Sequence, residues 1–166
     1  KTVVHMLIDI VSKNGNMLLS VPVKGDGTID DKEEKILEDI AAWMDVNKES
    51  IFGTRPWRVY GEGPSTENAI PLDGAGFNEN RNEPYTPADI RFVEKGNTVY
   101  AHVFEWPSDG RLLIKSLAKG NAHRSKVKKV ELLGAGKVNF KQTAEGLSVQ
   151  LPKGKKPNEI SLVLKI

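Results

Sequence analysis

Paired acidic side chains are the first candidates for chemistry, and three adjacent pairs occur: Asp30/Asp31, Glu33/Glu34 and Glu38/Asp39. Two carboxyl groups can hydrolyse a glycosidic bond when one protonates the leaving oxygen and the other attacks or activates water. All three pairs lie at or inside a predicted helix, where adjacent side chains point about 100° apart and do not face one substrate. The pairs therefore predict a capped, solvent-exposed helix surface and not a catalytic centre.

Nucleophilic, metal and redox chemistry find little support in the residue types present. The chain has no Cys, which removes disulfides, thiolate metal sites and Cys nucleophiles together. Its three histidines, His5, His102 and His123, show no short ligand spacing, and no serine lies in a GxSxG elbow. We therefore expect neither a metal site nor a cofactor.

Three tryptophans could form stacking surfaces for a sugar, and each has a structural alternative. Trp43 falls on the apolar stripe of a predicted helix, which favours burial in a core. Trp57 follows Pro56 where two differently patterned halves of the chain meet, so we expect a wedge between them. Trp106 ends a predicted strand and is the candidate for an exposed sugar contact, together with the nearby Tyr100.

The chain of 166 residues and 18.3 kDa suits one ordinary domain, or a small piece of one plus a second, and is too short for a complete barrel enzyme. Residues 1–110 carry 11 Lys/Arg and 19 Asp/Glu, whereas residues 111–166 carry 13 and 3. The Lys and Arg side chains of residues 111–166 are expected to lie on loops and exposed strand faces. This part of the chain is not expected to bind nucleic acid, because Phe140 is its only aromatic residue.

The N-terminal third predicts a helix, a strand and a second helix. Apolar residues at helical spacing over residues 2–13 end at Asn14-Gly15, and residues 31–46 repeat the helical pattern behind a capping acid. Between them, residues 16–21 read as a strand buried on both faces. Such a strand needs hydrogen-bonding neighbours that residues 1–50 do not supply. No apolar run long enough for a membrane span and no signal-peptide pattern occurs.

The C-terminal part predicts an antiparallel β-sandwich. Residues 61–88 are rich in Gly and Pro and read as a connecting excursion. From Asp89 onward, residues alternate between apolar and polar, with a hairpin turn at Lys95-Gly96-Asn97. Further strands are expected at residues 112–116, 127–132, 138–142, 146–151 and 160–166.

Three blocks resemble one known family, in that family's order and spacing. They are IVSKNGNMLLSVPVKGDGTID (residues 10–30), WMDVNKESIFGTRPW (residues 43–57) and DIRFVEKGNTVYAHVFEWP (residues 89–107). The first two are similar to the C-terminal part of the α-L-fucosidases of glycoside hydrolase family 29. The third resembles the opening hairpin of that family's C-terminal β-sandwich.

The resemblance implies a fold that is α+β overall: the last strand-helix unit of a (β/α)8-like barrel followed by an all-β antiparallel sandwich. Residues 1–59 would be the C-terminal end of the catalytic barrel, and residues 60–166 the C-terminal sandwich domain. The family hydrolyses terminal α-L-fucose from glycoconjugates with retention, using an Asp nucleophile and a carboxylic acid/base. Both belong to upstream barrel segments, so no residue of this chain is assigned a catalytic role and the chain alone is expected to be noncatalytic.

Ser20 and Lys24 are the substrate-binding candidates within the barrel part, because barrel active sites lie at the C-terminal ends of strands. Ser20 also lies in a stretch, Ser20-Val21-Pro22-Val23, that departs from the Asn-Ile/Val-Gly-Pro of many family members. The partners implied are fucosylated glycans and the upstream barrel, with a periplasmic or secreted location. The alternative is a noncatalytic carbohydrate-binding or scaffolding sandwich that uses Trp106.

Overall fold

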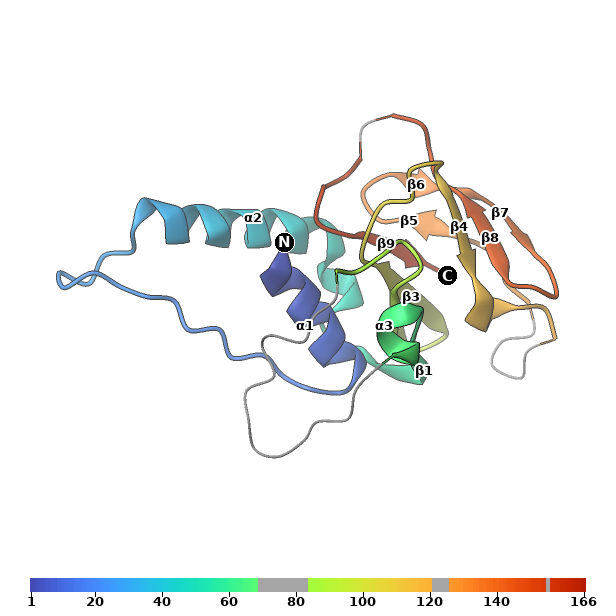
Figure 1. Cartoon of the computed structure of the whole chain (residues 1–166), viewed down its shortest axis with the longest axis horizontal. Coiled ribbons are helices and arrows are strands. Elements are labelled where there is room, and N and C mark those ends of the chain that lie inside the picture. The colour runs from blue at the N-terminus through green and yellow to red at the C-terminus, as the bar shows by residue number, and fades with distance from the viewer. Residues whose placement is uncertain (69–83, 121–125, 155) are drawn as a thin grey trace.

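The structure is a computed structural model that describes residues 1–68, 84–120, 126–154 and 156–166. Two helices come first, followed by strands that alternate with short helical turns (Figure 1). In chain order the elements are α1 (Thr2–Ser12), α2 (Asp31–Asn47), the 3-10 turn η1 (Lys48–Ser50), β1 (Arg55–Glu62), α3 (Pro64–Glu67), β2 (Ile90–Lys95), β3 (Thr98–Val103), β4 (Arg111–Ile114), the 3-10 turn η2 (Lys115–Leu117), β5 (Glu131–Leu132), β6 (Gly136–Lys137), β7 (Asn139–Gln142), β8 (Leu147–Gln150) and β9 (Leu162–Lys165).

The described strands form two antiparallel sheets that face each other. One sheet has the order β1-β2-β3-β9-β5-β6 and the other β4-β8-β7. Apolar side chains from both sheets fill the space between them, among them Phe92, Ile114, Leu132, Leu147 and Leu164. The structure is therefore mostly antiparallel sheet with few helices, consistent with the β-sandwich expected from the alternating pattern.

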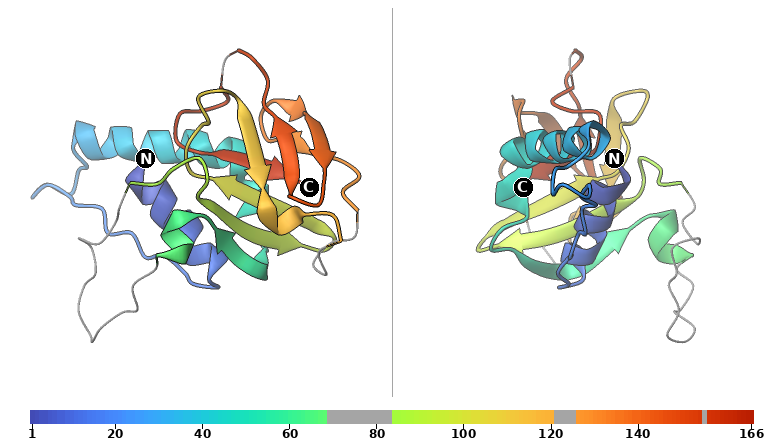
Figure 2. Two further views of the ribbon diagram at one scale, coloured as in Figure 1. Left: turned by 45° about the vertical axis from the view of Figure 1, so that its right-hand side comes forward. Right: turned by 90° about the vertical axis from the view of Figure 1, so that its left-hand side faces the viewer.

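Helices α1 and α2 form a third layer on the outer face of the six-stranded sheet (Figures 1 and 2). Val4 and Ile8 of α1 and Trp43 of α2 pack against Val93 and Val163 of that sheet. A sheet buried on both faces explains why β2 and β3 carry almost no exposed residue. No helix in the described part of the chain is long and apolar enough to cross a lipid bilayer.

Both helices and the hairpin follow the sequence expectations. Asp30 caps α2 by accepting hydrogen bonds from the backbone N–H groups of Lys32 and Glu33, at 2.9 and 3.1 Å. β2 and β3 pair in register from Ile90 with Val103 to Lys95 with Thr98, so a two-residue turn joins them. Gly96 adopts φ +59° in this turn, a conformation that glycine reaches without strain.

The strand expected at residues 16–21 does not form. This segment has no regular secondary structure and no sheet partner among the described residues, and Leu18 is 98% exposed. The segment does contain an apolar run, but a strand forms only where a second chain segment satisfies its backbone donors and acceptors. The last strand of the proposed barrel unit is thus absent from the structure.

The expectation for Trp57 is also wrong, because this side chain does not form a wedge between two halves of the chain. It lies on β1, which pairs with β2, and its ring meets Phe92 edge-on at 5.2 Å inside the sandwich core. β1 was not expected as a strand. It runs from Arg55 to Glu62 and so crosses the expected division at residues 59 and 60.

The later strands are shorter than the apolar pattern suggests. Within residues 127–132 only Glu131 and Leu132 pair in a sheet, although Val127 is buried in the sandwich core. The backbone N–H of Val127 instead donates to the side-chain oxygen of Gln142 at 3.0 Å. Of the excursion expected at residues 61–88, α3 forms a single turn, and residues 69–83 lie outside the described residues.

Candidate functional site

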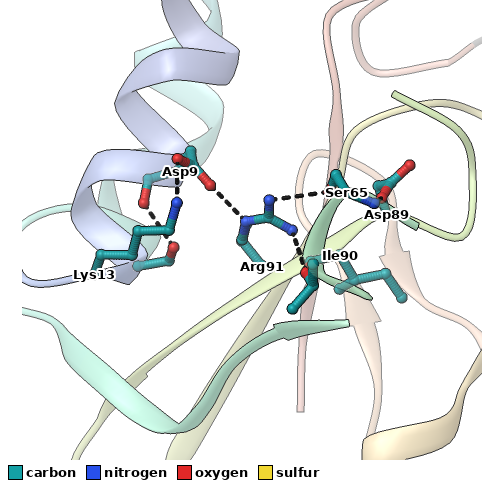
Figure 3. Close-up of polar contacts among 8 residues, drawn as sticks. Asp9, Lys13, Ser65, Asp89, Ile90 and Arg91 are labelled. Atoms are coloured by element: carbon teal, nitrogen blue, oxygen red, sulfur yellow. Dashed lines mark hydrogen bonds and ion pairs between the residues drawn. The ribbon is translucent and has the colours of Figure 1, made fainter. Parts of the chain in front are cut away.

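The most developed polar cluster lies where α1 meets the six-stranded sheet, around the guanidinium of Arg91 (Figure 3). Arg91 is on β2 and is only 2% exposed. Its Nε donates to Oδ1 of Asp9 on α1 at 2.6 Å, and its Nη2 donates to Ser65 at 3.0 Å. Nη1 donates to Thr66 at 3.1 Å and to the carbonyl of Ile90 at 3.3 Å. Every nitrogen of this guanidinium therefore has a partner.

Asp89 anchors the other side of the cluster. Its carboxylate is 1% exposed and accepts hydrogen bonds from the backbone N–H of Ser65 and from the N–H and hydroxyl of Thr86, at 2.7 to 2.8 Å. Burial alone would raise the pKa of Asp89, but these hydrogen bonds outweigh it and hold the pKa below its usual range. Gly63, at φ +103°, lets this turn lie against the backbone of Ala88, where a Cβ atom would collide.

Aromatic rings cover the remaining surface of the Arg91 guanidinium. It lies 5.3 Å from the ring centre of Phe104 and 5.9 Å from that of Tyr85, and these two rings stack at 3.9 Å. Lys13 completes the cluster by pairing with Oδ2 of Asp9 at 2.7 Å. A fully paired, buried cation has no free donor for a substrate, so this cluster fastens α1 to the sheet.

Sequence reasoning missed this cluster. The signal available was a charged residue, Arg91, between the apolar residues Ile90 and Phe92 of an expected strand. An acid on the polar side of the first helix, Asp9, was its possible partner. Only the packing of α1 on the sheet brings these two residues, 82 positions apart, together.

Ser20 and Lys24 lie in the segment between α1 and α2, which extends away from both sheets (Figure 1). Both residues are exposed. Lys24 begins a turn in which its N–H donates to the carbonyl of Thr28 at 2.7 Å, and Asp26 accepts from the N–H and hydroxyl of Thr28. The hydrogen bonds from Thr28 lower the pKa of Asp26. The turn keeps the Lys24 side chain free of the rest of the fold.

Exposed apolar side chains occur in the same segment as these two candidates and on α2, with no covering partner in the described part of the chain. In that segment Leu18, Leu19, Val23 and Ile29 are exposed, and Ile36 is exposed on α2. Single exposed apolar residues are common, but five within residues 18–36 mark a surface that normally lies against protein.

Trp106 is half-buried and packs on the sandwich core. Its Nε1 donates to the carbonyl of Asn158 at 3.2 Å, and the Lys156 ammonium lies 5.5 Å from its ring centre. Tyr100, its suggested companion, is 3% exposed on the helix-facing side of β3 and contacts Glu49. Trp106 and Tyr100 therefore pack in different apolar clusters and do not form one surface.

The Glu38/Asp39 pair and two of the histidines have structural partners. On α2, Lys35 pairs with Asp39 at 2.7 Å and with Glu38 at 3.6 Å, as expected for a solvated helix face. His5 and His102 each contact a backbone carbonyl, and His123 lies outside the described residues. Within the described ranges, no group of three potential metal ligands gathers.

Two family models match most of the chain. A family model described as alpha-L-fucosidase matches residues 1–49, and the model of the alpha-L-fucosidase C-terminal domain matches residues 82–166. These matches define the chain as glycoside hydrolase sequence. It belongs to the α-L-fucosidase family, and its second half is that family's C-terminal domain.

Individual relatives agree. The chain is 27% identical over 169 residues to the tissue alpha-L-fucosidase of Rattus norvegicus, covering 99% of this chain and 31% of the relative. It is 34% identical over 113 residues to the alpha-L-fucosidase of Dictyostelium discoideum, a match that covers 66% of this chain and 20% of the relative. The solved structure of the alpha-fucosidase of Thermotoga maritima superposes on this chain with a TM-score of 0.72 at 26% identity. The match covers 99% of this chain and 33% of that structure's chain. The chain thus spans about a third of the length of the first of these curated relatives.

Proposed function

We propose that this chain is the C-terminal portion of a retaining exo-α-L-fucosidase, which removes terminal α-L-fucose from glycoconjugates. Residues 1–59 would complete a (β/α)8-like catalytic barrel, and residues 60–166 would form the sandwich behind it, with β1 crossing from one to the other. Catalysis would use an Asp nucleophile and a carboxylic acid/base of the barrel. By itself the chain would be noncatalytic.

The exposed apolar unit is the observation that carries this proposal. Residues 16–21 have the composition of a buried parallel strand, yet Leu18 is 98% exposed and the segment lacks a sheet neighbour among the described residues. Neighbouring barrel strands would supply the missing hydrogen bonds and cover Leu18 and Leu19. The match of residues 1–49 to the alpha-L-fucosidase model supports the same placement.

Hydrolysis of a chromogenic α-L-fucoside tests the proposal. We expect no activity from the 166-residue chain and activity from a longer polypeptide in which fucosidase barrel segments precede Lys1. Activity of the chain alone would contradict its noncatalytic role. Inactivity of both forms, each shown to be folded, would count against the fucosidase proposal and favour a noncatalytic carbohydrate-binding or scaffolding module.

Ser20 and Lys24 are proposed to line the sugar pocket, since they would follow the last barrel strand at the catalytic face. In the active longer form, Ser20→Ala and Lys24→Ala should each lower kcat/KM about tenfold, the loss of one hydrogen bond to substrate. The turn at Lys24 is held by backbone bonds, so removing its side chain leaves the turn intact. Lys32→Ala, an exposed change on α2, is the matched control. Unchanged kinetics for both variants would remove these residues from the site.

A further inference from the structure

A hollow of about 510 Å³ opens at the end of the three-stranded sheet, where β4 begins and β8 ends. Figure 1 shows this sheet at the opposite end of the molecule from α2 and its projecting loop. The hollow is therefore remote from Ser20 and Lys24. Its size falls in the range of small-ligand sites, about 300 to 1,000 Å³.

Three polar side chains line the hollow in one row across the sheet. Arg111 of β4 pairs with Gln150 of β8, which pairs with Asn139 of β7. All three are exposed, while the residues next to them in each strand turn toward the core. Neighbouring strands lie about 4.8 Å apart, so the three side chains form a continuous polar row along the hollow.

The walls of the hollow are held in place by hydrogen bonds. Nε2 of Gln150 donates to the carbonyl of Gly110 at 3.0 Å, and the N–H of Leu151 donates to the same carbonyl at 2.9 Å. Oδ1 of Asp109 accepts from the N–H of Arg111 at 2.9 Å. These contacts fix the start of β4 against the end of β8, so a ligand would meet a largely preformed surface.

Positive charge gathers in this hollow, although one of its cations, Lys137, lies opposite Glu131 across β5 and β6. Arg111, Lys137 and Lys153 line it with a single acid, Asp109, and none of the three cations forms an ion pair with a described residue. By contrast, Lys165 is paired with Glu49 at 2.7 Å. Three cations, opposed by Asp109 in the lining and by Glu131 beside Lys137, leave a net positive charge that raises the local concentration of anions.

Apolar atoms complete the lining. Val138, Leu151 and Pro152 contribute to the hollow beside the polar row. A sugar ring presents C–H groups that pack on such side chains, while its hydroxyls need the amides and the carboxylate. None of the described residues that line the hollow is aromatic, so recognition of a ligand there would depend on hydrogen bonds and charge.

We propose that this hollow binds a saccharide that carries an anionic group, a sulfate ester or a carboxylate. The anionic group would be held by Arg111, which has a planar set of donors, and by Lys137 and Lys153. Charge-assisted hydrogen bonds to oxyanions are the strongest available to these side chains. Asn139, Gln150 and Asp109 would contact hydroxyls. The sandwich thereby gains a binding role of its own, separate from hydrolysis.

Calorimetric titration of the 166-residue chain tests this proposal with three probes: a galactose trisaccharide in neutral, sulfated and uronate forms. Both anionic forms, or one of them, should bind at least tenfold more tightly than the neutral form, and the affinity should fall as salt rises. A preference between them identifies the source of the anionic group. Equal binding of all three, or no binding at millimolar concentration, would overturn the proposal.

A charge-matched pair of variants separates a site from a general positive field. Arg111→Ala/Lys137→Ala should weaken binding of the preferred probe at least tenfold. Lys126→Ala/Lys128→Ala removes the same charge from exposed positions outside the lining and should change binding less than about threefold. Equal losses in both variants would show that net charge alone attracts the ligand. Because this assay involves no hydrolysis, its failure leaves the fucosidase proposal untouched.

Discussion

Asp9→Ala is expected to lower the free energy of unfolding by about 3 kcal/mol, because it leaves the Arg91 guanidinium buried and without its anionic partner. The expected loss is at the lower end for a broken buried pair, since the Asp9 side chain is itself partly exposed. For a chain of this size the change corresponds to roughly 6 to 12 °C in Tm. Urea unfolding followed by circular dichroism measures it.

Lys13→Ala is the matched control, because Lys13 contacts the other oxygen of the same carboxylate from an exposed position. It should cost about 0.5 kcal/mol or less. The double variant Asp9→Ala/Arg91→Met removes both buried charges and should recover much of the stability lost in Asp9→Ala. Equal losses for Lys13→Ala and Asp9→Ala would contradict the view that the buried pair fastens α1 to the sheet.

Acid should destabilise the protein through His102. This residue on β3 is 1% exposed, and its Nε2 donates to the carbonyl of Ser50 at 3.3 Å. Nδ1 is buried without a partner among the described residues, so a proton there would find no acceptor. Burial lowers the pKa of His102 from 6.5 to about 4, although the hydrogen bond to Ser50 opposes this shift.

The direction of this pH dependence follows from the number of protons bound in the folded and unfolded states. Between pH 6.5 and pH 4 the unfolded chain binds a proton at His102 that the folded chain excludes, so stability falls as the pH falls. The whole loss is about 3 kcal/mol and is complete below pH 4. Burial also lowers the pKa of His5, so this residue adds a further loss of stability as the pH falls.

His102→Gln isolates this contribution, because glutamine keeps a donor for the Ser50 carbonyl but does not titrate. Its unfolding free energy should depend less on pH between 7 and 4 than that of the parent, whatever its stability at pH 7. The cross-strand neighbour Arg91 is unchanged in this variant and remains paired with Asp9. NMR titration of the His102 ring gives its pKa directly. A pH dependence unchanged by the substitution would exclude His102 as its source.

Local patterns determined the parts of the fold that depend on neighbours in sequence. The apolar spacing before Asn14-Gly15 and the acid at Asp30 predict α1 and α2, because caps and helix faces are built within a few residues. Alternation around Gly96-Asn97 predicts the β2–β3 hairpin for the same reason. The family resemblance is confirmed by the two family models, which match residues 1–49 and 82–166.

Contacts between distant segments decided the rest. The apolar run at residues 16–21 has strand composition but no partner strand among the described residues, and pairing is a property of two segments. Arg91 could be recognised as buried only once α1 covered the second face of the sheet. The row of Arg111, Gln150 and Asn139 exists because three strands pair in one register. The sequence alone therefore determined the two long helices, the β2–β3 hairpin and the family. The tertiary structure decided which segments pair as strands and which charged side chains are paired, buried or left facing a ligand, since burial and pairing depend on residues far apart in the chain.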